Sequence, residues 1–145
     1  MCHEIFLSTT SPQDLAELPD TLFKFQVIEH EADPGILDLL AYPQTWLLLG
    51  EHGGCSCAFR HDMSGKDAYF SAPEDWFPED RDDIQATLGV YDLVATILSE
   101  GHKVDLVDIW NGDEPESIQS LDVSLSAVGR DAFRFFEKYK FNLTK

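Results

Sequence analysis

The clearest hydrophobic pattern in the chain has the period of an α-helix and begins near Asp82. On a helical wheel, one wide apolar face contains Ile84, Leu88, Tyr91, Val94, Ala95 and Leu98. The polar residues between them form only a narrow strip, which is typical of a helix packed deep against a sheet. Gly101 suits the position just after a helix end, where the backbone often turns left-handed. The pattern therefore predicts a helix over residues 82–100.

Strand-like patterns lie on both sides of this helix. Alternating or continuous apolar runs, bounded by Gly, Pro, Asp or Asn, predict strands at 4–8, 22–28, 45–50, 55–59, 104–110 and 120–127. The strands at 45–50 and 55–59 are joined by His52-Gly53-Gly54 and so predict a hairpin over 45–60.

Two further helices are expected. Ser11 and Pro12 suit the start of a short helix that runs through Leu18. A longer amphipathic helix is predicted over residues 130–140, where the aromatic residues Phe133, Phe136 and Tyr139 fall on one face.

Taken together, these elements predict one globular domain over residues 1–145. The expected fold is α+β: a two-layer sandwich in which a mostly antiparallel or mixed sheet of five to six strands is covered by two main helices. A length of 145 residues is usual for a single domain. A doubly wound parallel fold would need more crossover helices than the pattern provides.

The net charge limits the kinds of molecule that this protein can bind. The chain has 27 acidic and 10 basic residues, a formal charge of −17. Nucleic acids and anionic membranes are bound mainly through Lys and Arg, so both are excluded as partners. A basic protein, or a second copy of the chain, fits better. With no signal-like or membrane-spanning stretch and an odd number of cysteines, the expected location is the cytoplasm.

No familiar catalytic motif is present. The sequence contains no dinucleotide fingerprint, P-loop, HExxH, GxSxG or CxxC pattern. The leading hypothesis is therefore a protein-interaction or regulatory binding module with no catalytic residue and no cofactor. Whether the chain is an enzyme stays open.

The alternative hypothesis is a metal-binding protein. Cys55 and Cys57 are two residues apart, hence on one face of the predicted strand, and His52 directly precedes the turn before them. Thiolate and imidazole are the ligands that zinc or copper(I) prefers. The four-coordinate shell would be completed by residues from elsewhere in the chain, namely Cys2, His3 or His61.

Two other interpretations of the same cysteines compete with a metal site. Cysteine is often buried as a small hydrophobic residue, so Cys55, Cys57 and Phe59 can form a core-facing stripe, which is the favoured interpretation at this point. The third interpretation is a thiol-dependent enzyme, in which His52 or His61 lowers the pKa of one cysteine.

Overall fold

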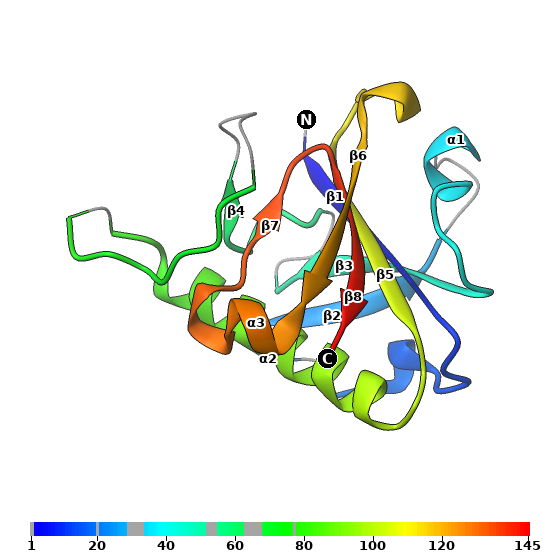
Figure 1. Cartoon of the computed structure of the whole chain (residues 1–145), viewed down its shortest axis with the longest axis horizontal. Coiled ribbons are helices and arrows are strands. Elements are labelled where there is room, and N and C mark those ends of the chain that lie inside the picture. The colour runs from blue at the N-terminus through cyan, green and yellow to red at the C-terminus, as the bar shows by residue number, and fades with distance from the viewer. Residues whose placement is uncertain (1, 20, 29–33, 52–54, 63–67, 77) are drawn as a thin grey trace.

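The computed structural model describes residues 2–19, 21–28, 34–51, 55–62, 68–76 and 78–145. Its centre is a mixed sheet of six strands in the spatial order β2-β3-β1-β5-β8-β6 (Figure 1). The strands are β1 (His3–Thr9), β2 (Phe23–Val27), β3 (Gln44–Gly50), β5 (Val104–Trp110), β6 (Gln119–Ser124) and β8 (Tyr139–Thr144). Neighbouring strands are antiparallel except for β6 and β8, which are parallel. Two short parallel strands, β4 (His61–Asp62) and β7 (Phe135–Phe136), pair beside this sheet.

The long helix is α2 (Arg81–Ser99). It begins where the Asp80 carboxylate accepts hydrogen bonds from the backbone N–H groups of Asp82 and Asp83, at 2.8 and 3.1 Å. It ends before Gly101, whose φ of +90° is readily adopted only by glycine. The other described helical segments are short: α1 (Pro34–Leu37), α3 (Leu125–Val128) and 3-10 turns at Leu15–Glu17, Pro115–Ser117 and Arg130–Ala132.

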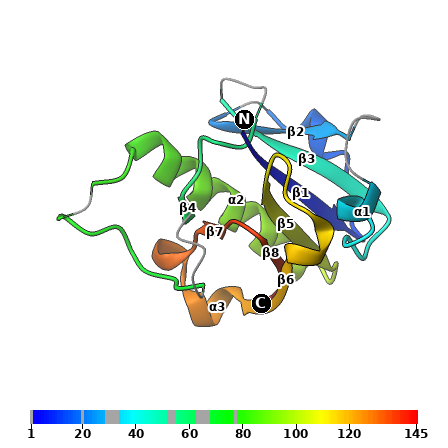
Figure 2. The ribbon, with the colours of Figure 1, turned by 90° about the horizontal axis from the view of Figure 1, so that it is seen from above.

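The two faces of the sheet carry cores of different size. The larger core joins the buried side of α2 to alternate residues of the central strands, such as Ile5, Leu7 and Leu106. The smaller core lies on the opposite face, where Phe6 and Val107 pack with Ile36 of α1. Figure 2 shows α2 and α1 on opposite sides of the sheet.

The α+β fold with a mixed sheet of six strands is confirmed. The two-layer sandwich with two main covering helices is not what the structure has. In the described part of the chain, α2 is the one long helix, and α1 lies on the opposite face of the sheet from α2. No helix among these residues is long and apolar enough to cross a bilayer.

The predicted helix over 130–140 is wrong. This segment forms a 3-10 turn, then β7, a turn at Lys138 with a φ of +66°, and the start of β8. Phe133, Phe135 and Phe136 are all buried, so the aromatic run enters the core from an extended chain and not from one face of a helix.

Two smaller predictions are also corrected. The expected helix at 11–18 is only a 3-10 turn capped by Asp14. The strand predicted over 120–127 ends at Ser124, whose hydroxyl accepts a hydrogen bond from the Ala127 N–H and so starts α3.

The predicted second strand of the hairpin, 55–59, does not form either. In place of the expected strand pairing, the Ser56 hydroxyl makes two hydrogen bonds. It donates to the Leu48 carbonyl and accepts from the Ile5 N–H at 2.9 Å. Gly50 allows the chain to return closely at this point, because a Cβ there would lie 2.6 Å from the Cβ of Ala58. The segment that contains Cys55 and Cys57 is therefore an irregular loop fastened to β1 and β3.

Candidate functional site

Three free thiols converge at one end of the sheet. Cys2 directly precedes β1, while Cys55 and Cys57 lie in the loop after β3. Their Sγ atoms all lie within 4.8 Å of one another. A tetrahedral zinc site, with Zn–S bonds of about 2.3 Å, would place its sulfurs about 3.8 Å apart. The three sulfurs are therefore near the spacing that a shared metal ion requires.

The loop that carries these thiols is held by Ser56, which is fully buried between them. The Ser56 N–H donates to the His3 carbonyl at 3.0 Å, and the His3 N–H points to the Cys57 Sγ at 3.3 Å. Cys57 itself is exposed and Cys55 is half-buried. The thiol cluster therefore lies at the surface, and the core-facing stripe of Cys55, Cys57 and Phe59 is not formed, since only Phe59 is buried.

Within the cluster, the pKa values of Cys55 and Cys57 shift in opposite directions. Burial alone raises the pKa of Cys55, but hydrogen bonds from Cys57 and Cys2 and the positive charge of His61 outweigh it and lower the pKa below its ordinary value. For Cys57, burial and the hydrogen bond with Cys55 raise the pKa to about 12. Cys55 is therefore the first thiol of this pair to become a thiolate, and Cys57 stabilises it as a donor.

A second group lies beside the thiols and is built from His3 of β1, His61 of β4 and Asp108 of β5. The two imidazole rings stack with centroids 3.9 Å apart and planes 12° apart. Nδ1 of His61 lies 2.7 Å from Oδ2 of Asp108, and Nδ1 of His3 lies 3.3 Å from Oδ1. All three side chains are at most 5% exposed. In contrast to the thiol cluster, this group is deep inside the protein.

Both nitrogens of His61 face hydrogen-bond acceptors. Nδ1 approaches the Asp108 carboxylate, and Nε2 lies 2.5 Å from the Ser56 carbonyl oxygen. A neutral imidazole has only one N–H, so this arrangement favours the doubly protonated ring. Burial lowers the pKa of His61, but the charge of Asp108 outweighs it and raises the pKa above 6.5. Likewise, burial raises the pKa of Asp108, and the charge of His61 brings it below its ordinary value.

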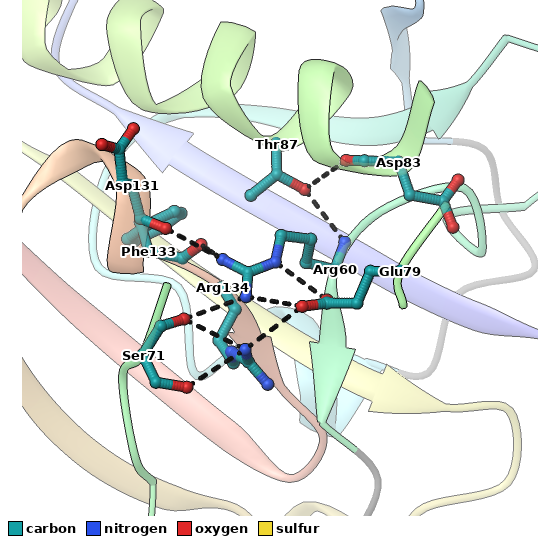
Figure 3. A network of polar contacts seen from close by, with 8 residues as sticks. All are labelled: Arg60, Ser71, Glu79, Asp83, Thr87, Asp131, Phe133 and Arg134. Atoms are coloured by element: carbon teal, nitrogen blue, oxygen red, sulfur yellow. Dashed lines mark hydrogen bonds and ion pairs between the residues drawn. The ribbon is translucent and has the colours of Figure 1, made fainter. Parts of the chain in front are cut away.

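Arg60 positions the segment that connects the two groups. Its backbone N–H donates to the Thr87 hydroxyl of α2, and its guanidinium uses all five N–H donors within the protein (Figure 3). Two of these bonds reach the Glu79 carboxylate, at 2.9 and 2.8 Å. The other three reach the carbonyl oxygens of Ser71, Asp131 and Phe133. His61, the next residue, is thereby fixed between the loop and Asp108.

The structure sorts the predicted ligands into two groups. Cys2, Cys55 and Cys57 come together, whereas His3 and His61 belong to the neighbouring group and point to Asp108. His52 lies outside the described residues. His61 is also not placed as a base for Cys55, because both of its nitrogens are engaged with Asp108 and Ser56.

Sequence reasoning missed Asp108. It lies within the run VDLVDIW, whose pattern predicts only a strand. The available signal was the pair Asp105 and Asp108 inside that run, because a buried carboxylate needs a partner. Asp105 has its own partners elsewhere: it accepts hydrogen bonds from Ser8 and the Ala41 N–H, and Lys140 lies 3.3 Å away.

Comparison of the chain with protein-family models, curated proteins and solved structures found no match. The functional argument therefore depends on the geometry of the thiol cluster and of the histidine–aspartate group.

Proposed function

We propose that this protein binds one soft or borderline metal ion, Zn²⁺ or Cu⁺, through Cys2, Cys55 and Cys57. The observation that carries the proposal is the convergence of the three Sγ atoms within 4.8 Å, from segments more than fifty residues apart in the chain. Thiolates are preferred ligands of both ions.

The exposure of the cluster supports a metal site over a packing role. A cysteine that only fills space is usually buried, yet Cys57 is exposed and Cys55 is half-buried. The lowered pKa of Cys55 favours its thiolate, whereas the pKa of Cys57 is raised to about 12, so Cys57 would lose its proton only to a bound cation. A bound cation would stabilise the remaining thiolates, since coordination lowers the pKa of a thiol.

The two ions would use the site differently. Cu⁺ is satisfied by three thiolates, whereas Zn²⁺ takes a fourth ligand. Because Cys57 faces solvent, the fourth position on Zn²⁺ is open to water or to a ligand from a partner. The role as an interaction module, the basic partner and the cytoplasmic location stay predictions from the sequence.

The test is metal analysis of tag-free protein purified under reducing conditions without chelator. We expect the wild type to carry about one zinc or copper per chain more than the Cys55→Ser/Cys57→Ser variant. Replacement by Co²⁺ should produce a sulfur-to-cobalt charge-transfer band that the double variant lacks. Anaerobic competition against chromophoric chelators then ranks Zn²⁺ and Cu⁺.

The matched control is His102→Gln, which removes a partly exposed histidine between α2 and β5, at the opposite end of β5 from Asp108. This variant should keep the metal and the charge-transfer band. A wild-type protein that takes up neither ion above the level of the double variant would refute the proposal.

A further inference from the structure

The histidine–aspartate group has polar atoms that the protein itself leaves unsatisfied. Among the described residues, Nδ1 and Nε2 of His3 and Oδ1 of Asp108 have no hydrogen-bond partner, although both side chains are more than nine-tenths buried. The 3.3 Å approach of His3 Nδ1 to Asp108 is a contact without the alignment of a hydrogen bond. Buried polar atoms destabilise a fold unless a water, an ion or another ligand satisfies them, so this cluster is a candidate ligand site.

We propose that His3, His61 and Asp108 form a second metal site, distinct from the thiol centre, for a borderline divalent ion of which Zn²⁺ is the best fit. One ligand atom from each side chain lies within 4.8 Å of the other two. Two imidazole nitrogens and one carboxylate form a donor set suited to Zn²⁺ and related first-row ions. The set is too hard for Cu⁺ and too rich in nitrogen for Mg²⁺ or Ca²⁺.

The hydrogen bond at the far side of His61 supports this assignment. Metal-binding histidines usually donate their second ring N–H to a carbonyl or carboxylate, which fixes the other nitrogen toward the metal. In this protein Nε2 of His61 faces the Ser56 carbonyl, so Nδ1 is the atom directed at Asp108. An ion at Nδ1 would replace the proton that now bridges His61 and Asp108, and Oδ1 of Asp108 and Nδ1 of His3 would gain a partner.

The surroundings favour a tightly held ion. The Trp110 ring packs edge-on against His3 with centroids 4.9 Å apart, and Phe59 and Phe135 pack around His61. A low-dielectric shell strengthens the attraction between a cation and the Asp108 carboxylate. Because the two stacked ring planes are only 12° apart, binding one ion through both Nδ1 atoms requires the rings to turn from this arrangement.

The decisive experiment uses the full-length Cys55→Ser/Cys57→Ser protein, in which the thiol centre is disabled. Titration with Co²⁺ as the probe should give visible d–d absorption with one equivalent and no sulfur charge-transfer band. Adding His61→Gln or Asp108→Asn should weaken Co²⁺ binding at least about tenfold, the lower end for losing even an outer partner of a metal ligand. Adding His102→Gln should leave the binding unchanged.

A second measurement avoids substitutions in the buried group. In the folded wild type, histidine side-chain ¹⁵N spectra recorded during Zn²⁺ titration should show the Nδ1 resonances of His3 and His61 moving together, with His102 as the internal reference. Unchanged His3 and His61 resonances, or Co²⁺ binding that survives both His61→Gln and Asp108→Asn, would leave the group as an imidazolium–carboxylate pair and overturn the proposal. Metal binding by the thiol centre is measured separately, from the sulfur-to-cobalt charge-transfer band of the wild type.

Discussion

The thiol cluster and the histidine–aspartate group share one short segment of chain and yet have opposite character. Ser56 touches both: its neighbours Cys55 and Cys57 belong to the first, and its carbonyl accepts from His61 of the second. Cys57 is exposed and Cys55 is half-buried, whereas aromatic rings pack against His3 and His61. If both groups bind metal as proposed, burial would decide which one exchanges ions with solvent and which one contributes to the fold.

The largest loss of stability should come from replacing Arg60, which holds the segment that connects the two groups. Arg60→Ala would leave the Glu79 carboxylate and three carbonyl oxygens without their buried partner. We expect a loss of about 3 to 5 kcal/mol in the free energy of unfolding, measured by urea titration, because several buried acceptors lose their donor at once and Arg134, 3.6 Å from Glu79, compensates that carboxylate only in part.

The control for Arg60 is Arg130→Ala. Arg130 makes a similar two-bond contact with Asp92, but both side chains are about half exposed, so stability should change little. Equal losses in the two variants would show that the Arg60 network does not fix the segment between the two groups.

A smaller effect is expected from Asp108→Asn, which breaks the buried group and spares the thiols. The loss should be about 2 to 3 kcal/mol, as for a hydrogen bond to a charged group. It is smaller than for Arg60 because His61 can release its proton when Asp108 is neutralised. Alkylation of Cys55 should slow only modestly, because neutral His61 no longer offers it a positive charge, and a large change would mean that the two groups are not separable.

The Asp108→Asn variant should also differ from the wild type in how its stability depends on pH. The pKa of His61 is raised in the folded protein, so its contribution to stability is complete below pH 6.5 and is lost as pH rises through the higher folded value. The pKa of Asp108 is lowered, so its contribution is present above pH 3.8 and is lost as pH falls through the lower folded value. Metal-free wild type should therefore lose stability above pH 6.5, and this loss should be much weaker in Asp108→Asn.

The smallest expected effect is a difference in alkylation rate between the thiols. Cys55 has a lowered pKa and Cys57 one of about 12, so iodoacetamide should modify Cys55 at least about tenfold faster at neutral pH, as followed by peptide mass spectrometry. His61→Gln removes a nearby positive charge and should slow Cys55 modestly. Faster modification of the more exposed Cys57 would mean that exposure and not pKa controls the reaction.

Much of the fold could be predicted from local patterns. The strands β1, β2, β3 and β5 and the helix α2 all appear near their predicted positions, because each buries one clear face or a continuous apolar run. The segment 130–140 could not be predicted, because its aromatic residues fit a helical face equally well. Its extended form depends on pairing with β4, β5 and β6, which are distant in the sequence.

The candidate site was predictable only in its ligand types. The spacing of Cys55 and Cys57 indicated a metal site, but their separation from His3 and His61 depends on Ser56, whose side chain holds the loop against β1 and β3. Asp108 lies beside the histidines because of the register between β1 and β5. This register places His3 opposite Trp110, and His3 therefore lies close to Asp108. No local pattern encodes a contact between residues about a hundred positions apart.

The position of β8 has a consequence for biosynthesis. This strand runs from Tyr139 to Thr144 and is inserted between β5 and β6, so it pairs with strands made earlier on both of its sides. Until these residues leave the ribosome, β5 has an open edge of unpaired N–H and C=O groups in a nascent chain that already contains β1 and β3. Folding of the sheet should therefore wait for β8 and be slow, as is usual for sheets built from distant segments, and β5 is the strand most in need of chaperone protection during that interval.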